Sequence, residues 1–380
     1  MKLVKLFGEQ WKIGLQLKKR NIKLRTIFIF VFSFVAIAAT KQDIYRKIKD
    51  SQRTINNVYK YLITHYVDDI DLEKFTKMSI DNMLSDLDPY TVYLVDDQKS
   101  GLDMLTSGQY GGVGIQIGKR DNVITVIAPT DDSPAKRAGI MAGDVLIKID
   151  GEDTESMSMD DAAKLIRGKK GSSVVLTIER FNEEEPIDFT LTREDIPVKD
   201  VSYFGMLDES IGYIRLTRFS KNSADEVEKA IVSLKSNALS SIVLDLRDNP
   251  GGLLNSAVSI LDMFIEKDEL LVWTDGKARQ SSKKYYSKSD PIVSDDIQIA
   301  VLINGGSASA SEIVAGVMQD LDRGVVVGRQ SFGKGLVQTV YNIDRNKALK
   351  VTTAKYYIPS GRVIQKSGYL PEEILADTTE

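Results

Sequence analysis

The chain has 380 residues, of which 42% are hydrophobic and 27% charged, as in an ordinary globular protein of two or three domains. Its net charge of −4 gives no overall basic field, which argues against nucleic acid as a partner. The absence of cysteine excludes disulfides, a thiolate zinc site and a cysteine nucleophile, and the single histidine, His65, argues against a transition-metal centre.

The first 40 residues have the pattern of an export segment. A basic stretch at 1–25 precedes an apolar run at 27–39, which is shorter than the roughly 20 residues that span a bilayer comfortably. Because the basic stretch is long for a signal peptide, we favour a membrane anchor at 26–40, with everything after Lys41 outside the cytoplasm. Two alternatives stay open: a signal cleaved near residues 36–38, which would give a secreted protein, and a buried core helix.

Residues 41–104 are expected to form an N-terminal helical region. Apolar residues recur there three and four positions apart, and the sequence Asp88-Pro89-Tyr90-Thr91 interrupts the pattern. Four carboxylates lie close together between positions 68 and 73. They fit a solvated turn and the first turn of a helix better than a cation site.

Residues 107–193 resemble a PDZ domain. The resemblance rests on a glycine-containing loop before a strand at 110–117, the sequence AGDVLIKIDG at 142–151, and a predicted helix at 159–166. In PDZ domains this loop offers backbone N–H groups to the terminal carboxylate of a peptide, and the next strand pairs with that peptide. The resemblance therefore implies a substrate-binding set: Gly112, Val113, Gly114, Ile115 and Leu165.

From residue 196 the pattern is α/β. Predicted strands at 212–216 and 241–246 flank a helix at 223–236, and the second strand runs into a Gly251-Gly252 turn before another helix. Such a turn exposes backbone N–H groups and suits an oxyanion hole, although a plain strand-to-helix turn has the same pattern. Residues 274–293 predict a polar hairpin or loop.

The segment 301–340 contains the candidate catalytic residues. A strand at 301–303 is followed by SASASE and a helical pattern, so that a serine lies at a helix N-terminus. A second strand at 325–327 leads to Lys334, and the alternation that follows predicts a strand with Lys334, Leu336 and Gln338 on one face. Since cysteine is absent and histidine is distant, the base left for a serine is a lysine whose pKa is lowered by burial.

Two other interpretations apply to the same segment. Ser309 followed by Glu312 is also a capping box, which needs no catalysis to explain it. Residues 328–335 imitate the phosphate loop G-x-x-x-x-G-K. The final Ser or Thr is replaced by Gly335, and a strand follows where a helix should, so we expect no nucleotide site.

Four ordered motifs together resemble the carboxy-terminal processing peptidases, also called tail-specific proteases: DLRxNPGG, SASASE, FGKGxVQ and TTAKYYIPSGRVIQ. The resemblance implies that Ser309 is the nucleophile, Lys334 the general base and Gln338 the residue that orients the lysine. It also implies oxyanion donors at Ala310 and at Gly251 or Gly252. The implied fold is multidomain α/β: the N-terminal helical arm, the PDZ domain, and a crotonase/Clp-protease-like α/β peptidase core at 196–380.

The sequence thus predicts an exported serine endopeptidase that recognises protein C-termini through its PDZ domain and hydrolyses peptide bonds with a Ser-Lys dyad. It would need no metal or cofactor. Its expected partners are substrate C-termini and, through the N-terminal segment, the membrane; a homo-oligomer is left open. Alternatives are a non-catalytic PDZ scaffold or chaperone, which the retained Ser309, Lys334 and Gln338 disfavour, and a crotonase-type acyl-CoA hydratase or thioesterase, which the PDZ segment and the export signal disfavour.

Overall fold

The computed structural model describes residues 43–120, 122–235 and 238–365. The predicted anchor at 26–40 lies outside these residues. Within them, every helix is too short or too polar to span a membrane. The chain divides into two compact units, Met1–Ser79 and Ile80–Glu380.

The first unit is helical. Residues 43–65 form a helix, and α2 (Leu72–Leu84) begins close after it. The Asp71 carboxylate accepts the backbone N–H groups of Glu73 and Lys74, each at 3.1 Å, and so caps the start of α2. The acidic stretch around it is therefore a helix start, as predicted. His65 packs its ring against Tyr61 in this unit, with 6.0 Å between the centroids.

The helical expectation for 41–104 was wrong at one point. Strand β1 (Val92–Val95) lies between α2 and α3 (Asp97–Ser107), and it pairs antiparallel with β18 (Lys347–Tyr357), where Val92 is opposite Lys350. The partner strand comes from the other end of the chain. Local periodicity carries no information about such a partner, because strand formation depends on tertiary pairing.

The PDZ segment forms its own sheet and core. Its strands run in the order β3 (Ile115–Arg120), β4 (Val123–Pro129), β5 (Val145–Ile149), β7 (Ser173–Glu179) and β8 (Ile187–Thr192), and β6 (Glu152–Asp153) pairs with β5. Two helices, α4 (Pro134–Ala138) and α5 (Met159–Ile166), complete the domain, and β2 (Gln109–Gly112) pairs with β9 (Glu194–Pro197) at its ends. Strand β3 is an edge strand of this sheet.

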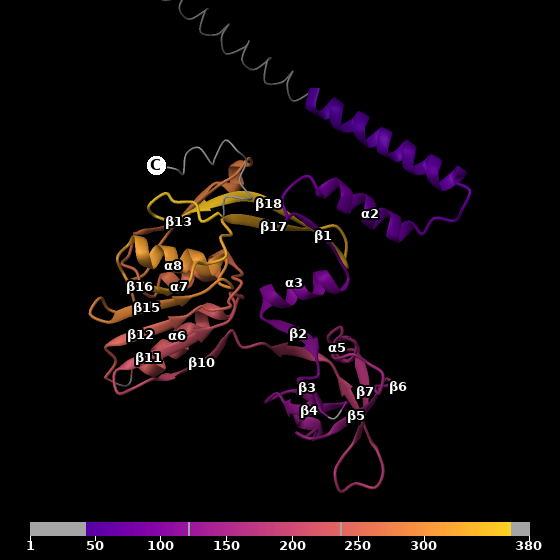
Figure 1. Cartoon of the computed structure of the whole chain (residues 1–380), viewed down its shortest axis with the longest axis horizontal. Coiled ribbons are helices and arrows are strands. Elements are labelled where there is room, and N and C mark those ends of the chain that lie inside the picture. The colour runs from indigo at the N-terminus through magenta and orange to yellow at the C-terminus, as the bar shows by residue number, and fades with distance from the viewer. Residues whose placement is uncertain (1–42, 121, 236–237, 366–380) are drawn as a thin grey trace, which may run out of the picture. The chain divides into compact units, whose positions relative to one another are not determined.

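The peptidase segment contains a five-stranded sheet with helices packed on it (Figure 1). The strand order is β10 (Val201–Met206), β11 (Ile211–Leu216), β12 (Ser241–Asp245), β15 (Gln298–Ile303) and β16 (Val325–Gly328); β10 is antiparallel and the others are parallel. The helices are α6 (Ser223–Leu234), α7 (Leu254–Leu261) and α8 (Ala310–Asp320). Apolar side chains from these strands and helices share one core.

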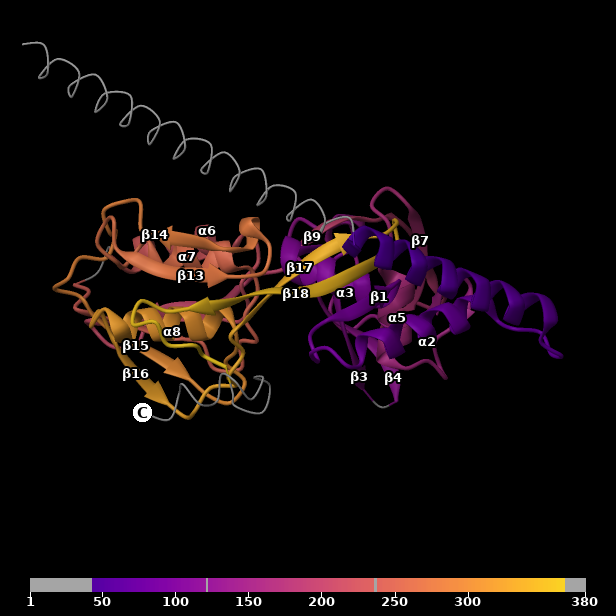
Figure 2. The ribbon, with the colours of Figure 1, turned by 90° about the horizontal axis from the view of Figure 1, so that it is seen from above.

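A second sheet is built around β18 (Figure 2). β18 pairs with β1, with β17 (Leu336–Asn342) and with β13 (Leu270–Asp275), and β13 pairs with β14 (Lys283–Tyr286) after the short 3₁₀ helix η1 (Arg279–Ser281). The hairpin or loop predicted for 274–293 overlaps the β13–β14 pair, which begins earlier, at Leu270, and ends at Tyr286. Strand β17 begins two residues after Lys334 and therefore ties the candidate base to this sheet.

Candidate active site

Ser309 lies where the central sheet passes into α8. Strand β15 ends at Ile303, a turn of small residues follows, and Ser309 is the residue that caps α8. Its backbone has φ 55° and ψ −111°, a conformation rare for any residue other than glycine, which costs on the order of 1–3 kcal/mol. The serine is thus held in a strained turn at the positive end of a helix dipole.

The three serines of SASASE have different surroundings. Ser307 donates its hydroxyl to the Leu246 carbonyl at 2.8 Å, and Ser311 donates to the Asn249 carbonyl at 2.9 Å; both side chains are fully buried. Ser309 is half-buried and lines a cavity of about 320 Å³. Only the middle serine therefore presents its hydroxyl to a space that a substrate can occupy.

Lys334 lines the same cavity as Ser309. The pKa of Lys334 is lowered to about 8, mainly by burial and next by the positive charge of Lys350, whereas the charges of Glu312 and Asp88 raise it. The Lys334 ammonium nitrogen lies 4.8 Å from the centre of the Tyr90 ring. A neutral amine is consequently accessible close to neutral pH, as the role of a base requires.

The backbones of Ser309 and Lys334 are joined by two buried side chains. The Glu312 carboxylate accepts the N–H of Ser309 at 2.7 Å and the N–H of Lys334 at 2.9 Å, and it is 2% exposed. On the other side, the Tyr356 hydroxyl donates to the carbonyls of both Ser309 and Lys334. One acceptor and one donor thus fix the separation of the two residues.

Glu312 also holds the loop that carries the lysine. Its other oxygen accepts the Ser331 hydroxyl at 2.7 Å and the Gly333 N–H at 2.6 Å. The capping interpretation of Ser309 and Glu312 is therefore confirmed. It does not compete with the catalytic one, because the same carboxylate caps α8 and fixes the lysine loop.

Two backbone N–H groups beside Ser309 are available as donors. Within the part of the chain that the structure describes, the N–H groups of Ala310 and Gly252 have no hydrogen-bond acceptor, whereas Gly251 donates to the Asn249 side chain at 2.9 Å. Both glycines have positive φ, and a Cβ on Gly252 would lie 2.1 Å from the Phe219 carbonyl oxygen. Of the two predicted glycines, Gly252 is the one whose donor is free.

Gln338 lies in the same cavity, but its amide does not reach the lysine. It donates to the Leu336 carbonyl at 3.2 Å and approaches the Thr352 hydroxyl at 3.5 Å. The expected alternation of Lys334, Leu336 and Gln338 is broken by a β-bulge between Val337 and Gln338, and β17 begins only at Leu336. The predicted orienting role of Gln338 stays a prediction.

Comparison with known proteins identifies the family. Residues 210–375 match peptidase family S41, and residues 125–180 match the PDZ domain. A carboxy-terminal-processing protease of Bartonella bacilliformis is 40% identical over 323 residues, which cover 84% of this chain and 74% of that protein. The chain belongs to the carboxy-terminal-processing protease family.

A second curated relative agrees with this assignment. A probable CtpA-like serine protease of Staphylococcus aureus is 35% identical over 351 residues, 91% of this chain and 70% of that protein. The solved structure of a photosystem II D1 C-terminal processing protease is 29% identical, covers 82% of this chain and 83% of its own, and has a TM-score of 0.46. The predicted family, the α/β fold with PDZ and peptidase parts, and the serine-type peptidase activity are confirmed.

The predicted peptide-binding residues of the protease lie around the edge strand of the PDZ sheet. Val113 is fully buried, and Gly114 has φ +74° with its carbonyl bonded to Ser133. Ile115 begins β3, and Leu165 is a half-buried residue of α5, which packs beside β3. Gly112 ends β2. The loop and the strand edge thus adjoin, with α5 beside them.

Sequence reasoning missed a staple that places Tyr90 against the lysine. The Asp88 carboxylate accepts the N–H of Tyr90 at 2.9 Å and the hydroxyls of Thr91 and Thr352, each at 2.8 Å. Thr352 lies on β18, so the carboxylate fastens the segment before β1 to that strand. The sequence Asp88-Pro89-Tyr90-Thr91 looked only like a helix break, and nothing local pointed to its partner.

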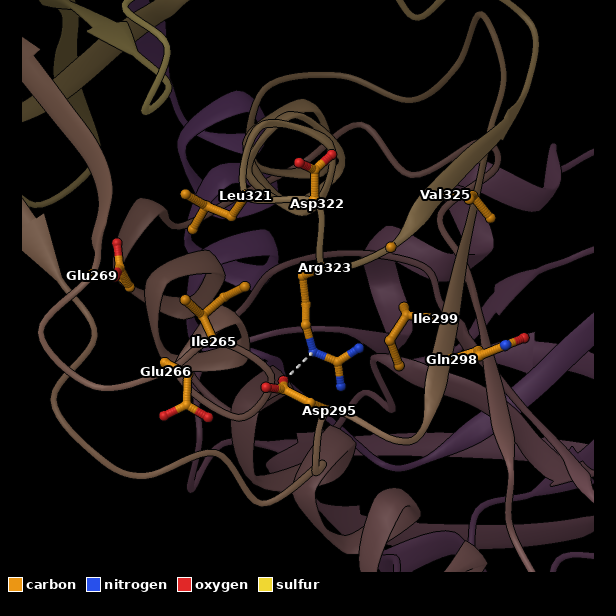
Figure 3. Close-up of a pocket in the computed structure, with 11 residues that line it drawn as sticks. Ile265, Glu266, Glu269, Asp295, Gln298, Ile299, Leu321, Asp322, Arg323 and Val325 are labelled. Atoms are coloured by element: carbon orange, nitrogen blue, oxygen red, sulfur yellow. Dashed lines mark ion pairs between the residues drawn. The ribbon is translucent and has the colours of Figure 1, made fainter.

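A larger cavity of the protease, of about 770 Å³, is lined by the segment that follows α8 and by the start of β15, and Ser309 is not part of its lining (Figure 3). Arg323 reaches into it and makes an ion pair with Asp295 at 3.6 Å. Its guanidinium also donates to the carbonyls of Phe264, Ile297 and Ser294 at 2.9 to 3.0 Å. These contacts bind the guanidinium to the loops around it, so Arg323 has a structural role here.

Proposed function

We propose that this protease is an exported serine endopeptidase in which Ser309 is the nucleophile and Lys334 the general base. The observation that carries the proposal is one cavity lined by Ser309 of the SASASE motif, by a lysine with a pKa of about 8, and by Ala310 and Gly252, whose N–H groups have no acceptor among the described residues. A serine needs a base, and a lysine serves as one only when burial makes its neutral form accessible.

The proposed reaction has two halves. The neutral Lys334 amine takes the Ser309 proton as the serine oxygen attacks the scissile carbonyl, and the N–H groups of Ala310 and Gly252 stabilise the oxyanion. The Lys334 ammonium then gives its proton to the departing amine, which leaves an ester on Ser309. Water attacks this ester with Lys334 again as base, and the acid product and the free serine hydroxyl are regenerated.

The supporting framework is the bracket formed by Glu312 and Tyr356. Because both side chains bind the backbones of both residues, the distance between nucleophile and base does not depend on two flexible loops. Holding reacting groups in place is a large part of enzymatic rate enhancement. We assign Glu312 and Tyr356 positioning roles, since in this scheme they act through the backbones of Ser309 and Lys334.

We further propose that the PDZ domain binds the C-terminus of the protein substrate. The edge strand β3 offers a free edge for pairing, and the loop from Gly112 to Ile115 offers backbone N–H groups at its start. Leu165 on α5 would contact the last side chain of the peptide. The binding set is the one predicted from the sequence.

The peptidase half of the proposal is tested with casein. Ser309→Ala should abolish cleavage and leave the chain folded, because only one hydroxyl is removed; the loss of stability should not exceed the roughly 0.5–2 kcal/mol of a helix N-cap. Ser307→Ala is the matched control, which should lose stability and keep activity. If Ser309→Ala cleaves normally and a correctly folded Ser307→Ala is inactive, the nucleophile is Ser307 and our assignment to Ser309 is wrong.

The PDZ half is tested with a protein substrate whose C-terminus is either a free acid or an amide. Amidation removes the charge that backbone N–H groups bind most strongly, so it should weaken binding to the full chain and slow cleavage. Calorimetry and cleavage rates measure the two effects. Equal binding and equal rates for the two forms would mean that the PDZ domain does not read the C-terminus.

We also propose that residues 26–40 anchor the enzyme in the membrane with the catalytic part outside the cytoplasm. The apolar run beside a dense basic stretch supports this location. Accessibility of residues after Lys41 to an external protease in intact cells measures it. Protection of these residues until the membrane is opened would contradict the proposal, and recovery of the chain in the medium would favour a cleaved signal.

A further inference from the structure

We propose that Lys350 is a specificity-determining residue that binds a carboxylate of the substrate peptide near the scissile bond. The carboxylate belongs either to an acidic side chain or to the free C-terminus of the peptide. The inference rests on the proposed function, because it takes the cavity at Ser309 as the place where the peptide is cut.

Lys350 is a half-buried residue of β18 that lines the cavity with Ser309 and Lys334. Within the described residues its ammonium group has neither an ion pair nor a hydrogen bond, which is unusual for a half-buried charge. Burial lowers the pKa of Lys350, and the negative charge of Asp88 opposes this effect. The protein therefore bears the cost of an uncompensated cation at the substrate cavity.

Asp88 is the nearby carboxylate, and it is already committed. One of its oxygens accepts the N–H of Tyr90, the N–H of Thr91 and the Thr352 hydroxyl, and the other accepts the Thr91 hydroxyl. These four bonds hold the segment before β1 in place, so Asp88 is not free to turn toward Lys350. It acts on the lysine only through its longer-range field.

Arg218 is a second cation of the cavity, and its charge is paired. Its guanidinium lies 3.4 Å from the buried Asp200 carboxylate. The lining contains three cations, Arg218, Lys334 and Lys350, and no carboxylate. Arg218 is paired with Asp200, and Lys334 is the proposed general base. Lys350 is the cation without an assignment.

The other residues that line the cavity indicate which class of molecule carries the carboxylate that Lys350 would bind. Apolar side chains form most of the cavity wall: Leu102, Leu105, Leu253, Leu254, Ile313, Leu336, Val337 and Val340. Such a wall suits the aliphatic side chains of a peptide, and one cation set among them fixes orientation and specificity. The site therefore favours an apolar peptide with a carboxylate at one position.

The test compares peptides that differ only in charge. A peptide cut from casein is made with both termini blocked, and a single Glu or Gln is placed in turn at each position around the scissile bond. At one position the full-length enzyme should cut the Glu peptide with about fivefold higher kcat/KM, as expected for an ion pair worth about 1 kcal/mol. Lys350→Gln should reduce this ratio to about one, and Lys350→Glu should favour a Lys peptide instead.

Lys347→Gln is the matched control. Lys347 lies on the same strand outside the cavity and pairs with Asp344 at 3.9 Å, so its loss should leave the Glu/Gln ratio unchanged. Lys350→Met repeats the test with a different neutral side chain, and unfolding temperatures show which variants are folded. A Glu preference that survives Lys350→Gln would overturn the proposal. So would the absence of a Glu preference at every position together with no Lys350-dependent preference for a free C-terminus over its amide.

The pH profile separates recognition from tuning. If Lys350 serves only to lower the pKa of Lys334, Lys350→Gln will move the profile to higher pH for both peptides and leave their ratio unchanged. That result also overturns the proposal. Lys334 faces Tyr90 and is influenced by Lys350, Glu312 and Asp88, so the profile is measured with both peptides for every variant.

Two further arms complete the design. A neutral peptide with a free C-terminus is compared with its amide. If the enzyme prefers the free acid and Lys350→Gln abolishes this preference, the terminal carboxylate is the ligand of Lys350. If the preference survives Lys350→Gln, it is due to the PDZ domain. Fluorescence anisotropy with blocked peptides on the Ser309→Ala chain measures the Glu/Gln binding ratio without cleavage. If the wild-type enzyme cuts nothing, the proposed function fails, while this ratio still decides the role of Lys350.

Discussion

Two cavities of this protease are lined by basic side chains, and Arg323 in the larger cavity and Lys334 in the smaller one have opposite surroundings. Arg323 donates to the carbonyls of Phe264, Val293, Ser294 and Ile297 and pairs with Asp295, so its charge is neutralised by the fold. Lys334 stands in a cavity whose lining has no carboxylate, with its nitrogen over the Tyr90 ring. The first cation joins loops, and the second is kept available.

Burial lowers the pKa of both groups, but the consequence differs with chemistry. A guanidinium begins so high that it keeps its proton at every physiological pH, whereas a lysine brought to about 8 exchanges its proton there. Arg323 in the larger cavity therefore has a structural role, and Lys334 in the smaller cavity can act as a base. Size alone would have chosen the wrong site.

The sharpest way to break this comparison is to give the smaller cavity the cation of the larger one. Lys334→Arg keeps the positive charge, but a guanidinium does not lose its proton at physiological pH and so cannot act as a base. Cleavage of casein should fall by about 10²–10⁴-fold, the range of a lost general base. Lys347→Arg makes the same change outside the cavity and should have no effect. Substantial activity in Lys334→Arg would show that Lys334 is not the general base of Ser309.

A smaller effect is expected when the bracket is weakened. Glu312→Gln keeps the shape of the side chain, but an amide cannot accept from all four donors, so kcat should fall by about ten- to a hundredfold with little change in KM. Because the Glu312 charge raises the pKa of Lys334, its loss should also move the pH profile to lower pH. Steady-state kinetics across pH measure both quantities.

Glu228→Gln, on the exposed side of α6, is the control for this change. A merely structural role for Glu312 would lower the unfolding temperature and leave the pH profile of the folded enzyme in place. Wild-type kcat and an unshifted profile in Glu312→Gln would show that the bracket does not position the dyad.

The smallest effect on catalysis is expected at the larger cavity. Arg323→Met should lower the free energy of unfolding by about 3 kcal/mol, because several buried carbonyls lose their donor, while kcat of the folded enzyme stays the same. Urea unfolding and kinetics of the full chain give the two numbers, with the exposed Arg345→Met as control. A drop in kcat without a loss of stability would mean that the two cavities are not as different as we infer.

Features that depend on local pattern were predictable from the sequence. The helix expected at 159–166 is α5, and the strands expected around Tyr213 and Val243 are β11 and β12. Their apolar residues repeat with the period of the element, which the chain itself displays. The same holds for the turn at Gly251 and Gly252 and for the helix that follows Ser309.

Features that depend on distant partners were not predictable in this way. β1 exists because β18 lies beside it, the bulge at Gln338 reflects the register of β17 on β18, and Tyr90 meets Lys334 only through the Asp88 staple. The choice among the three serines has the same origin. The local patterns of the three serines are equivalent. The hydroxyls of Ser307 and Ser311 donate to the carbonyls of Leu246 and Asn249, which come from another part of the chain.

The most direct test of the account is the pH dependence of the reaction of Ser309 with a serine-directed phosphonylating reagent, followed by mass spectrometry of the full chain. Only the neutral amine of Lys334 accepts a proton, so labelling should rise with pH, with a midpoint at about 8, and it should be lost in Lys334→Arg. The variant His65→Gln should give the same curve as the wild type. A midpoint near the ordinary histidine value of about 6.5 that disappears in His65→Gln, or labelling that persists in Lys334→Arg, would contradict the account.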